Sequence, residues 1–215
     1  MSVTKTTGGE VYSVKNSGEW ATIVVRCWAD DIDGKPWHRG EILINSTFGS
    51  WANFWNAPGM PFKRFLIGLD FDYCMQKLMG RDLQEHDGDA TLQALQHRLL
   101  EMRRKRRLDK QAAAWLWSEI NDRSGSLSGS VESFVDACGC IQQEASQSWN
   151  RRVLGHSLDE IGELLAEPWY MTETRDNPQA VGFWRTIWPE FTQALRDDLA
   201  QFPIPSQAGA NKEGA

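Results

Sequence analysis

The hydrophobic pattern of the chain changes its period near residue 60. Upstream of that point, apolar and β-branched side chains form short runs at Thr22 to Val25 and Gly40 to Ser46. Both runs are typical of strands, and the first suits a strand covered at least in part on both faces. Because Asp33-Gly34 is a strong turn signal, we expect an antiparallel hairpin with a long tip. A third, edge strand over Glu10 to Asn16 is compatible with the pattern.

Downstream, apolar residues recur every three or four positions, as on one face of a helix. One predicted helix runs from Pro61 to Gly80, and a second runs from a cap at Asp89 through Met102. Further helix starts are marked by Asp109, Ser130, Ser157 with Glu160, and Asn177 with Pro178. Pro189 is expected to kink or split the last helix, since proline cannot donate the helical hydrogen bond.

An aromatic block, STFGSWANFWNAPG, lies between these two regions at Ser46 to Gly59. If Ser46 or Ser50 caps a short helix there, Phe48, Trp51 and Trp55 fall on one face. We therefore expect the block to be a helical seam that joins the sheet to the helices. Phe54 lies off that stripe and is the ring expected to remain available to a partner.

The pattern predicts an α+β fold, with a small N-terminal antiparallel sheet of two or three strands packed against a mainly helical body. We expect one domain over residues 1–202. The segment SGSLSGS (Ser124 to Ser130) is interpreted as a flexible loop within it. The tail over residues 203–215 has little to bury and is expected to be disordered.

Composition and charge limit the partners and the cellular location that we expect for this protein. The 215 residues carry a net charge of −6, which argues against a protein coated in nucleic acid. The chain shows no leader pattern and no apolar run near the roughly 18 residues of a membrane span. Its four cysteines are scattered. We therefore expect reduced thiols and a cytoplasmic location, with no membrane contact.

Four short motifs resemble metal or catalytic signatures, and each has a simpler interpretation. Asp70 and Asp72 are two apart and diverge on a helix, while the Asp30 to Gly34 segment lacks calcium ligands at the first and twelfth loop positions. Cys138 and Cys140 also point apart on a helix. His86-Asp87 would need partners from other helices to build a metal-dependent hydrolase. We expect no cofactor and no metal, and a non-enzymatic role is favoured.

Two charged clusters are candidate interaction surfaces. The predicted hairpin tip combines acidic side chains with a tryptophan and two basic side chains, a mixture typical of contact patches: Asp30, Asp31, Asp33, Trp37, His38 and Arg39. The run RRKRR holds five cations at the end of a predicted helix: Arg103, Arg104, Lys105, Arg106 and Arg107. Those cations either complement the helix dipole or bind phosphates or an acidic protein surface.

The segment GEILINSTFGSWANFWNAPGMPFKRFLIGLDFDYCMQKLMG (Gly40 to Gly80), with FWRTIWPEF (Phe183 to Phe191), resembles uncharacterised proteins of bacteriophages and prophages. The resemblance implies an accessory protein of a mobile element, which acts in the infected or lysogenic cell by binding host or phage machinery. Our leading hypothesis is a protein that binds host nucleic-acid-processing or defence machinery. A nucleic-acid-binding module that uses the basic run and a metal-dependent hydrolase are the alternatives.

Overall fold

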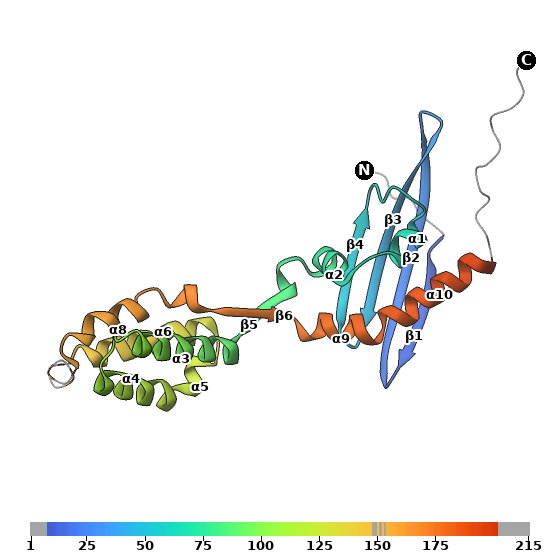
Figure 1. The fold of residues 1–215 in the computed structure, drawn as a ribbon. Coiled ribbons are helices and arrows are strands. Elements are labelled where there is room, and N and C mark those ends of the chain that lie inside the picture. Colours follow the sequence, from blue (N-terminus) through green and yellow to red (C-terminus); the bar gives the residue numbers. More distant parts are fainter. Residues whose placement is uncertain (1–7, 148–149, 151, 153, 202–215) are drawn as a thin grey trace, which may run out of the picture. The chain divides into compact units, whose positions relative to one another are not determined.

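The computed structural model describes residues 8–147, 150, 152 and 154–201 (Figure 1). The chain divides into two compact units, each with a hydrophobic core of its own. Unit 1 comprises residues 1–83 and 177–215, and unit 2 comprises residues 84–176. The tail predicted to be disordered, residues 203–215, lies outside the described residues.

Unit 1 is built on an antiparallel sheet of four strands in the order β1-β2-β3-β4. The strands are β1 (Glu10–Asn16), β2 (Glu19–Ile32), β3 (Lys35–Ser46) and β4 (Gly49–Trp55). The α+β class is confirmed, and so are the first three strands. The prediction of two or three strands was one strand short, because β4 occupies part of the segment expected to be helical.

The aromatic block forms β4 instead of a helical seam. Trp51 and Trp55 are four residues apart, a spacing that fits one face of a helix and one face of a strand equally well. In the structure Trp51 lies opposite Ile44 and Trp55 opposite Gly40, so both rings point into the core. Phe54 points to the other face, as every second residue of a strand does, and is 49% exposed.

The predicted antiparallel β2–β3 hairpin is confirmed, and the residues expected at its long tip are themselves paired up to a tight turn. Ile32 lies directly opposite Lys35, and Asp33 and Gly34 between them both have positive φ, of 53° and 74°. Such angles suit the two-residue turns that match the twist of antiparallel strands. The pairing of β2 and β3 therefore continues through residues 26–39, beyond the last partners of β1 and β4. We call residues 26–39 the arm.

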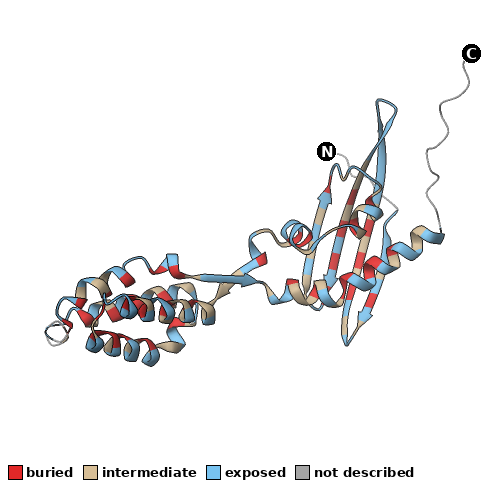
Figure 2. Ribbon diagram, in the orientation of Figure 1, coloured by how far each residue is buried: buried red, intermediate tan, exposed pale blue. Residues whose placement is uncertain are grey.

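Helices cover one face of this sheet and leave the other face, which we call the outer face, exposed (Figure 2). Buried side chains of the sheet pack with those of the helices: α1 (Phe62–Ile67), α2 (Phe71–Met79), α9 (Pro178–Thr186) and α10 (Trp188–Gln201). A 3-10 turn, η1 (Gly80–Leu83), follows α2. The predicted split at Pro189 is confirmed, since α9 ends just before α10 begins.

The single helix predicted from Pro61 to Gly80 is interrupted at Gly68. Asp70 starts the second part as its N-cap, and its carboxylate accepts a hydrogen bond from the backbone N–H of Tyr73 at 2.8 Å. Asp70 therefore serves as a helix cap in the Asp70-x-Asp72 pair. Gly80 ends α2 with a φ of 59°, as predicted.

Unit 2 is a helical bundle with a two-stranded antiparallel ribbon. Its elements are β5 (Gln84–Asp87), α3 (Gly88–Arg104), α4 (Lys110–Asp122), α5 (Ser124–Leu127), α6 (Val131–Ala145), α8 (Ser157–Leu165), η2 (Pro168–Met171) and β6 (Glu173–Asp176). Asp109 and Ser130 cap α4 and α6 as predicted.

Three local predictions in unit 2 are wrong. Asp87 caps α3 in place of Asp89, because β5 delivers it directly to the first turn of the helix. The segment interpreted as a flexible loop contains α5, which is anchored by the buried Leu127. Ser157 does not cap α8; its buried hydroxyl donates to Asp109 Oδ2 at 3.1 Å.

The chain leaves and re-enters unit 1 at neighbouring points. The backbone N–H of Asn177 donates to the carbonyl of Leu83 at 2.8 Å, and within unit 2 Gln84 lies opposite Asp176. Unit 2 is thus an insertion whose two ends are paired. How cooperatively the two units unfold decides whether they behave as the single domain predicted over residues 1–202.

We expect scanning calorimetry of the full chain to resolve two unfolding transitions, because each unit buries its own apolar core. A variant that weakens only unit 1, such as Gly40→Ala, should then lower one transition and leave the other in place. A single transition that moves as a whole would show that the two units unfold together.

Replacing Gly40 with alanine should destabilise unit 1 by about 1–3 kcal/mol. An added Cβ at Gly40 would lie 2.0 Å from the ring of Phe62, so α1 would have to move away from β3. Urea unfolding measures the change. Gly139 in α6 is the matched control, since a Cβ added there would meet nothing within 4 Å, and Gly139→Ala should be neutral or slightly stabilising.

Candidate functional site

The arm is the first candidate site, because it carries six of the predicted interaction residues. Successive side chains of a strand point to opposite faces, so its residues divide into two sets. Trp28, Asp30, Trp37 and Arg39 continue the outer face of the sheet, whereas Asp31 and His38 lie on the opposite side. The structure thus brings Asp30, Trp37 and Arg39 to the same side as Phe54 and separates them from Asp31 and His38.

An aromatic cluster with fixed geometry occupies the outer side of the arm. The rings of Trp28 and Phe54 stack with centroids 5.7 Å apart and planes inclined by 14°. The guanidinium of Arg26 lies 6.0 Å from the Trp28 ring, within the range of a cation–π contact. The indole N–H of Trp37 donates to the carbonyl of Asn56 at 2.7 Å. These contacts hold the rings in place while each of the three stays more than a third exposed.

The charges on this side are arranged in pairs. Arg26 forms an ion pair with Glu41 at 2.8 Å, and Arg39 forms one with Asp30 at 2.9 Å. Because each arginine has a carboxylate partner on the same face, this surface combines exposed rings with nearly balanced charge. Aromatic and arginine side chains in such a setting are typical of the residues that contribute most to protein interfaces.

The acidic residues at the tip serve the turn. Asp31 Oδ1 accepts a hydrogen bond from the backbone N–H of Gly34 at 2.8 Å, and Asp33 occupies the first turn position. Asp31 and Asp33 therefore stabilise the end of the arm. Their contribution to a contact surface stays a prediction.

The basic run in unit 2 contains two cations that form ion pairs and three exposed arginines. Arg107 pairs with Glu160 and, at 2.7 Å, with Glu163 of α8, while Lys105 lies 3.7 Å from Glu101. None of the ion pairs found in the described part of the chain involves Arg103, Arg104 or Arg106, and all three are exposed. One of the five cations, Arg107, thus links the segment after α3 to α8, whereas Lys105 pairs within the end of α3 itself.

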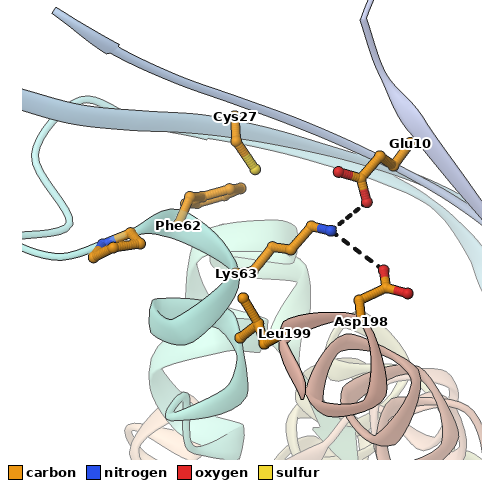
Figure 3. A pocket seen from close by; sticks show the side chains of 7 residues that line it. Glu10, Cys27, Phe62, Lys63, Asp198 and Leu199 are labelled. Atoms are coloured by element: carbon orange, nitrogen blue, oxygen red, sulfur yellow. Dashed lines mark hydrogen bonds and ion pairs between the residues drawn. The ribbon is translucent and has the colours of Figure 1, made fainter. Parts of the chain in front are cut away.

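A cavity of about 320 Å³ at the base of the arm is the second candidate site (Figure 3). The amine of Lys63 lies between the carboxylates of Glu10 and Asp198, and it is 3.2 Å from Asp198 Oδ2. The hydroxyl of Tyr12 lies 2.6 Å from Glu10 Oε2 and 2.5 Å from Asp198 Oδ2, and it can donate its proton to only one of them at a time. This cluster joins β1, α1 and α10.

The cluster changes the proton affinity of its members. Burial, together with hydrogen bonds to Asp198 and Glu10, raises the pKa of Tyr12. The hydrogen bond from Tyr12 and then the contact with Lys63 lower the pKa of Asp198, although its desolvation opposes this. Burial disfavours the charge on Lys63, but the hydrogen bonds to Glu10 and Asp198 outweigh it and raise the pKa. The ionised forms of Lys63 and Asp198 therefore stabilise one another.

Cys27 lines the same cavity but is not an activated nucleophile. Although its side chain stays accessible, desolvation of the thiol and then the charge of Glu10 raise its pKa to about 11, and the opposing effect of Lys63 is smaller. A thiol with this pKa is almost entirely protonated at neutral pH, whereas nucleophilic cysteines have lowered values.

The short motifs that resemble metal sites occupy ordinary positions in the fold. Asp87 caps α3, and His86 lies in β5 opposite Thr174. Cys138 is buried in the core of unit 2, while Cys140 is exposed. Within residues 8–147, 150, 152 and 154–201, no three histidine, cysteine or acidic side chains gather as metal ligands would.

Trp28 is the central residue that the sequence pattern did not single out. It lies two positions from both Arg26 and Asp30, on the same side of the strand. The alternation of faces along β2 would place Trp28 beside Arg26 and Asp30, provided that the strand is known to continue past Arg26.

The fold and the site define an α+β protein that presents an open sheet face and a two-stranded arm with stacked aromatic side chains. A family model, Phage_phiTE_072, described as a phage family, matches residues 1–197. The chain belongs to this phage family, in agreement with the resemblance noted above. No curated protein matches the chain, and no solved structure does either. Among the helices of the described segments, none is long and apolar enough to cross a membrane.

Replacing Asp198 with asparagine should lower stability at pH 7, by about 1 kcal/mol at most because this carboxylate is partly exposed. A lowered pKa means that the ionised carboxylate stabilises the fold above the ordinary value of 3.8, and that this effect is lost as the pH falls through the folded-state pKa. Urea unfolding at pH 7 and near pH 3 should therefore show a difference between the two proteins that shrinks in acid.

Asp197→Asn is the control for this experiment. Its carboxylate accepts a hydrogen bond from Gln193 at 2.8 Å in place of the contacts with Tyr12 and Lys63. A deficit of Asp198→Asn that stays constant down to pH 3, or one that Asp197→Asn reproduces, would contradict the role of this ion cluster.

Proposed function

We propose that this phage protein is a non-enzymatic interaction protein that binds a host or phage protein through the outer side of its arm. The observation that carries the proposal is the stacked pair Trp28 and Phe54, held rigid beside Trp37 and two paired arginines. Rings that are already oriented lose little conformational freedom on binding, which favours affinity. Tryptophan and arginine are also the residues most enriched at interface centres.

A protein partner fits this surface better than nucleic acid. A protein binds a nucleic-acid backbone by placing its cations on the phosphates, and the nucleic acid releases the small counterions that were there. On the arm, Arg26 and Arg39 already pair with Glu41 and Asp30, so a phosphate would have to compete with a carboxylate held in place. A protein surface, in contrast, can cover the rings and leave both ion pairs intact at the edge of the contact.

The proposed target is host nucleic-acid-processing or defence machinery in the cytoplasm of the infected or lysogenic cell. Membership of a phage family supports this setting, because a phage protein is made in the cell that the phage infects or inhabits. On this view the protein modulates or inhibits its target by occupying a surface, and it needs no cofactor to do so.

Binding of nucleic acid by the basic run is the second candidate function. The observation in its favour is the exposure of Arg103, Arg104 and Arg106 without ion pairs among the described residues. It receives less support than the arm, because Arg107 and Lys105 of the same run have carboxylate partners. Binding of DNA or RNA that weakens with salt and on neutralising these three arginines would favour it.

The arm proposal is tested in two stages, starting with affinity purification from infected cells to obtain a stoichiometric partner. The double variant Trp28→Ala/Phe54→Ala should then weaken binding of the purified partner at least about 30-fold, because interface hot spots contribute about 2 kcal/mol or more. Isothermal titration calorimetry measures the dissociation constant. The fold should persist, since neither side chain belongs to the buried core of unit 1.

Trp117→Ala in unit 2 is the matched control, because Trp117 and Trp28 have the same exposed fraction of 37%. It should bind the partner like the unchanged protein. Equal weakening by both variants, no weakening by the arm variant, or the absence of any stoichiometric partner would contradict the proposal.

A further inference from the structure

The outer face of the sheet has an apolar row that the described residues of unit 1 leave uncovered. Four side chains lie directly opposite one another across all four strands: Val11, Val24, Leu43 and Ala52. Val11 is 62% exposed and Leu43 is 38% exposed. An antiparallel sheet with one buried face usually alternates apolar and polar residues, which keeps its open face polar. Here the apolar row follows the pattern of a sheet covered on both faces.

The neighbouring rows limit what can cover this face. One side of the apolar row has a polar row of Ser13, Thr22, Asn45 and Ser50. The other side has the ion pair of Arg26 with Glu41, next to Phe54. That row thus holds one cation beside one anion, while the chain as a whole is acidic, with a net charge of −6. A partner with one strong sign of charge would gain little here.

A second copy of the same face meets these conditions. In a contact with two-fold symmetry each residue of one patch meets the corresponding patch of the partner, so the patch must be complementary to itself. The apolar row supplies matching aliphatic side chains, and Arg26 and Glu41 supply one charge of each sign beside it. Two such faces can approach without net repulsion and bury the row against its own copy.

The size of the face is also sufficient. Four strands spaced about 4.8 Å apart and seven residues long make an area roughly 19 Å by 24 Å, and side chains roughen it. With that roughening, two such faces together bury on the order of 1,000 Å², which is about the minimum for a specific interface. Sheets packed face to face lie about 10 Å apart with interdigitated side chains, which suits valine, leucine and alanine.

We propose that two copies of this chain form a dimer through their outer faces, sheet against sheet, with Val11, Val24, Leu43 and Ala52 at its centre. The dimer goes beyond the proposed function and does not rest on it. Trp28 and Trp37 of each arm lie past the paired region of β1 and β4, outside the centre of this contact, and stay available to another protein.

Sedimentation equilibrium tests the proposal, and the unchanged protein should have twice the mass of one chain. Leu43→Lys should raise the dissociation constant of the dimer roughly a hundredfold or more, because an unpaired lysine would enter the interface from both copies. Leu100→Lys is the matched control, since Leu100 lies in unit 2 and is 40% exposed. It should leave the dimer unchanged. Circular dichroism confirms that both variants fold.

A pair of charge variants provides a second readout that does not depend on the leucine. Arg26→Glu makes the row of residues 26 and 41 wholly negative, and Glu41→Arg makes the same row wholly positive. Each variant alone should be monomeric because like charges face each other, whereas an equimolar mixture should form a heterodimer.

Three results would overturn the dimer. The first is an unchanged protein that is monomeric at high micromolar concentration. In that case, a loss of thermal stability on Leu43→Lys would indicate a cover within the chain itself. The second is a dimer that tolerates Leu43→Lys and both charge variants. The third is nucleic acid that co-purifies with the protein and is displaced by the same variants. Loss of the arm's partner without loss of the dimer would refute only the proposed function.

Discussion

The close approach of Phe62 to the bare backbone of Gly40 is the contact on which the architecture of unit 1 depends. Gly40 lies where β3 leaves the four-stranded part of the sheet and becomes the arm. Without a side chain there, the Phe62 ring can lie against β3, packed with Trp55 at a centroid distance of 5.6 Å. The position of Phe62 in turn brings Lys63, the next residue of α1, between Glu10 and Asp198. One missing methyl group thus links the sheet, α1 and α10.

The two faces of the sheet follow different physical rules. Towards the helices, the strands bury isoleucine, valine and tryptophan side chains in a continuous core, and the hydrophobic effect alone explains them. On the other face, apolar side chains stay exposed beside paired charges. Cross-strand contacts among such residues stabilise a sheet only modestly, by much less than full burial of the same side chains would. Their presence there is best explained by association, and both proposals made above rest on this asymmetry.

Sequence reasoning located β1, β2 and β3 because β-branched runs and turn residues gave consistent local signals. It missed β4 because Trp51 and Trp55 satisfy the periods of a helix and of a strand at once, and the pairing with β3 decided between them. The arm was missed for another reason. Its polar, charged composition resembles a loop, and only the cross-strand register from Arg26 to Arg39 makes it a strand pair.

The candidate residues Trp37, Arg39 and Phe54 could be picked out from the sequence. That they lie on the same side of the sheet could not be predicted from it. Likewise, five consecutive cations were evident at Arg103 to Arg107, whereas the partners of Arg107 lie in a helix about fifty residues further on.

The insertion of unit 2 determines the order in which the chain can fold during its synthesis. The strands of unit 1 leave the ribosome first, followed by α1 and α2, but α9 and α10, which complete the cover of their apolar side, follow only after about ninety residues of unit 2. At translation rates of about 5–20 residues per second, the sheet lacks these two helices for several seconds or longer. Unit 2 is complete before that moment and can fold while unit 1 remains half-built. The nascent sheet is therefore the part of this protein most in need of a chaperone, and the last helices to emerge complete the structure that the first residues began.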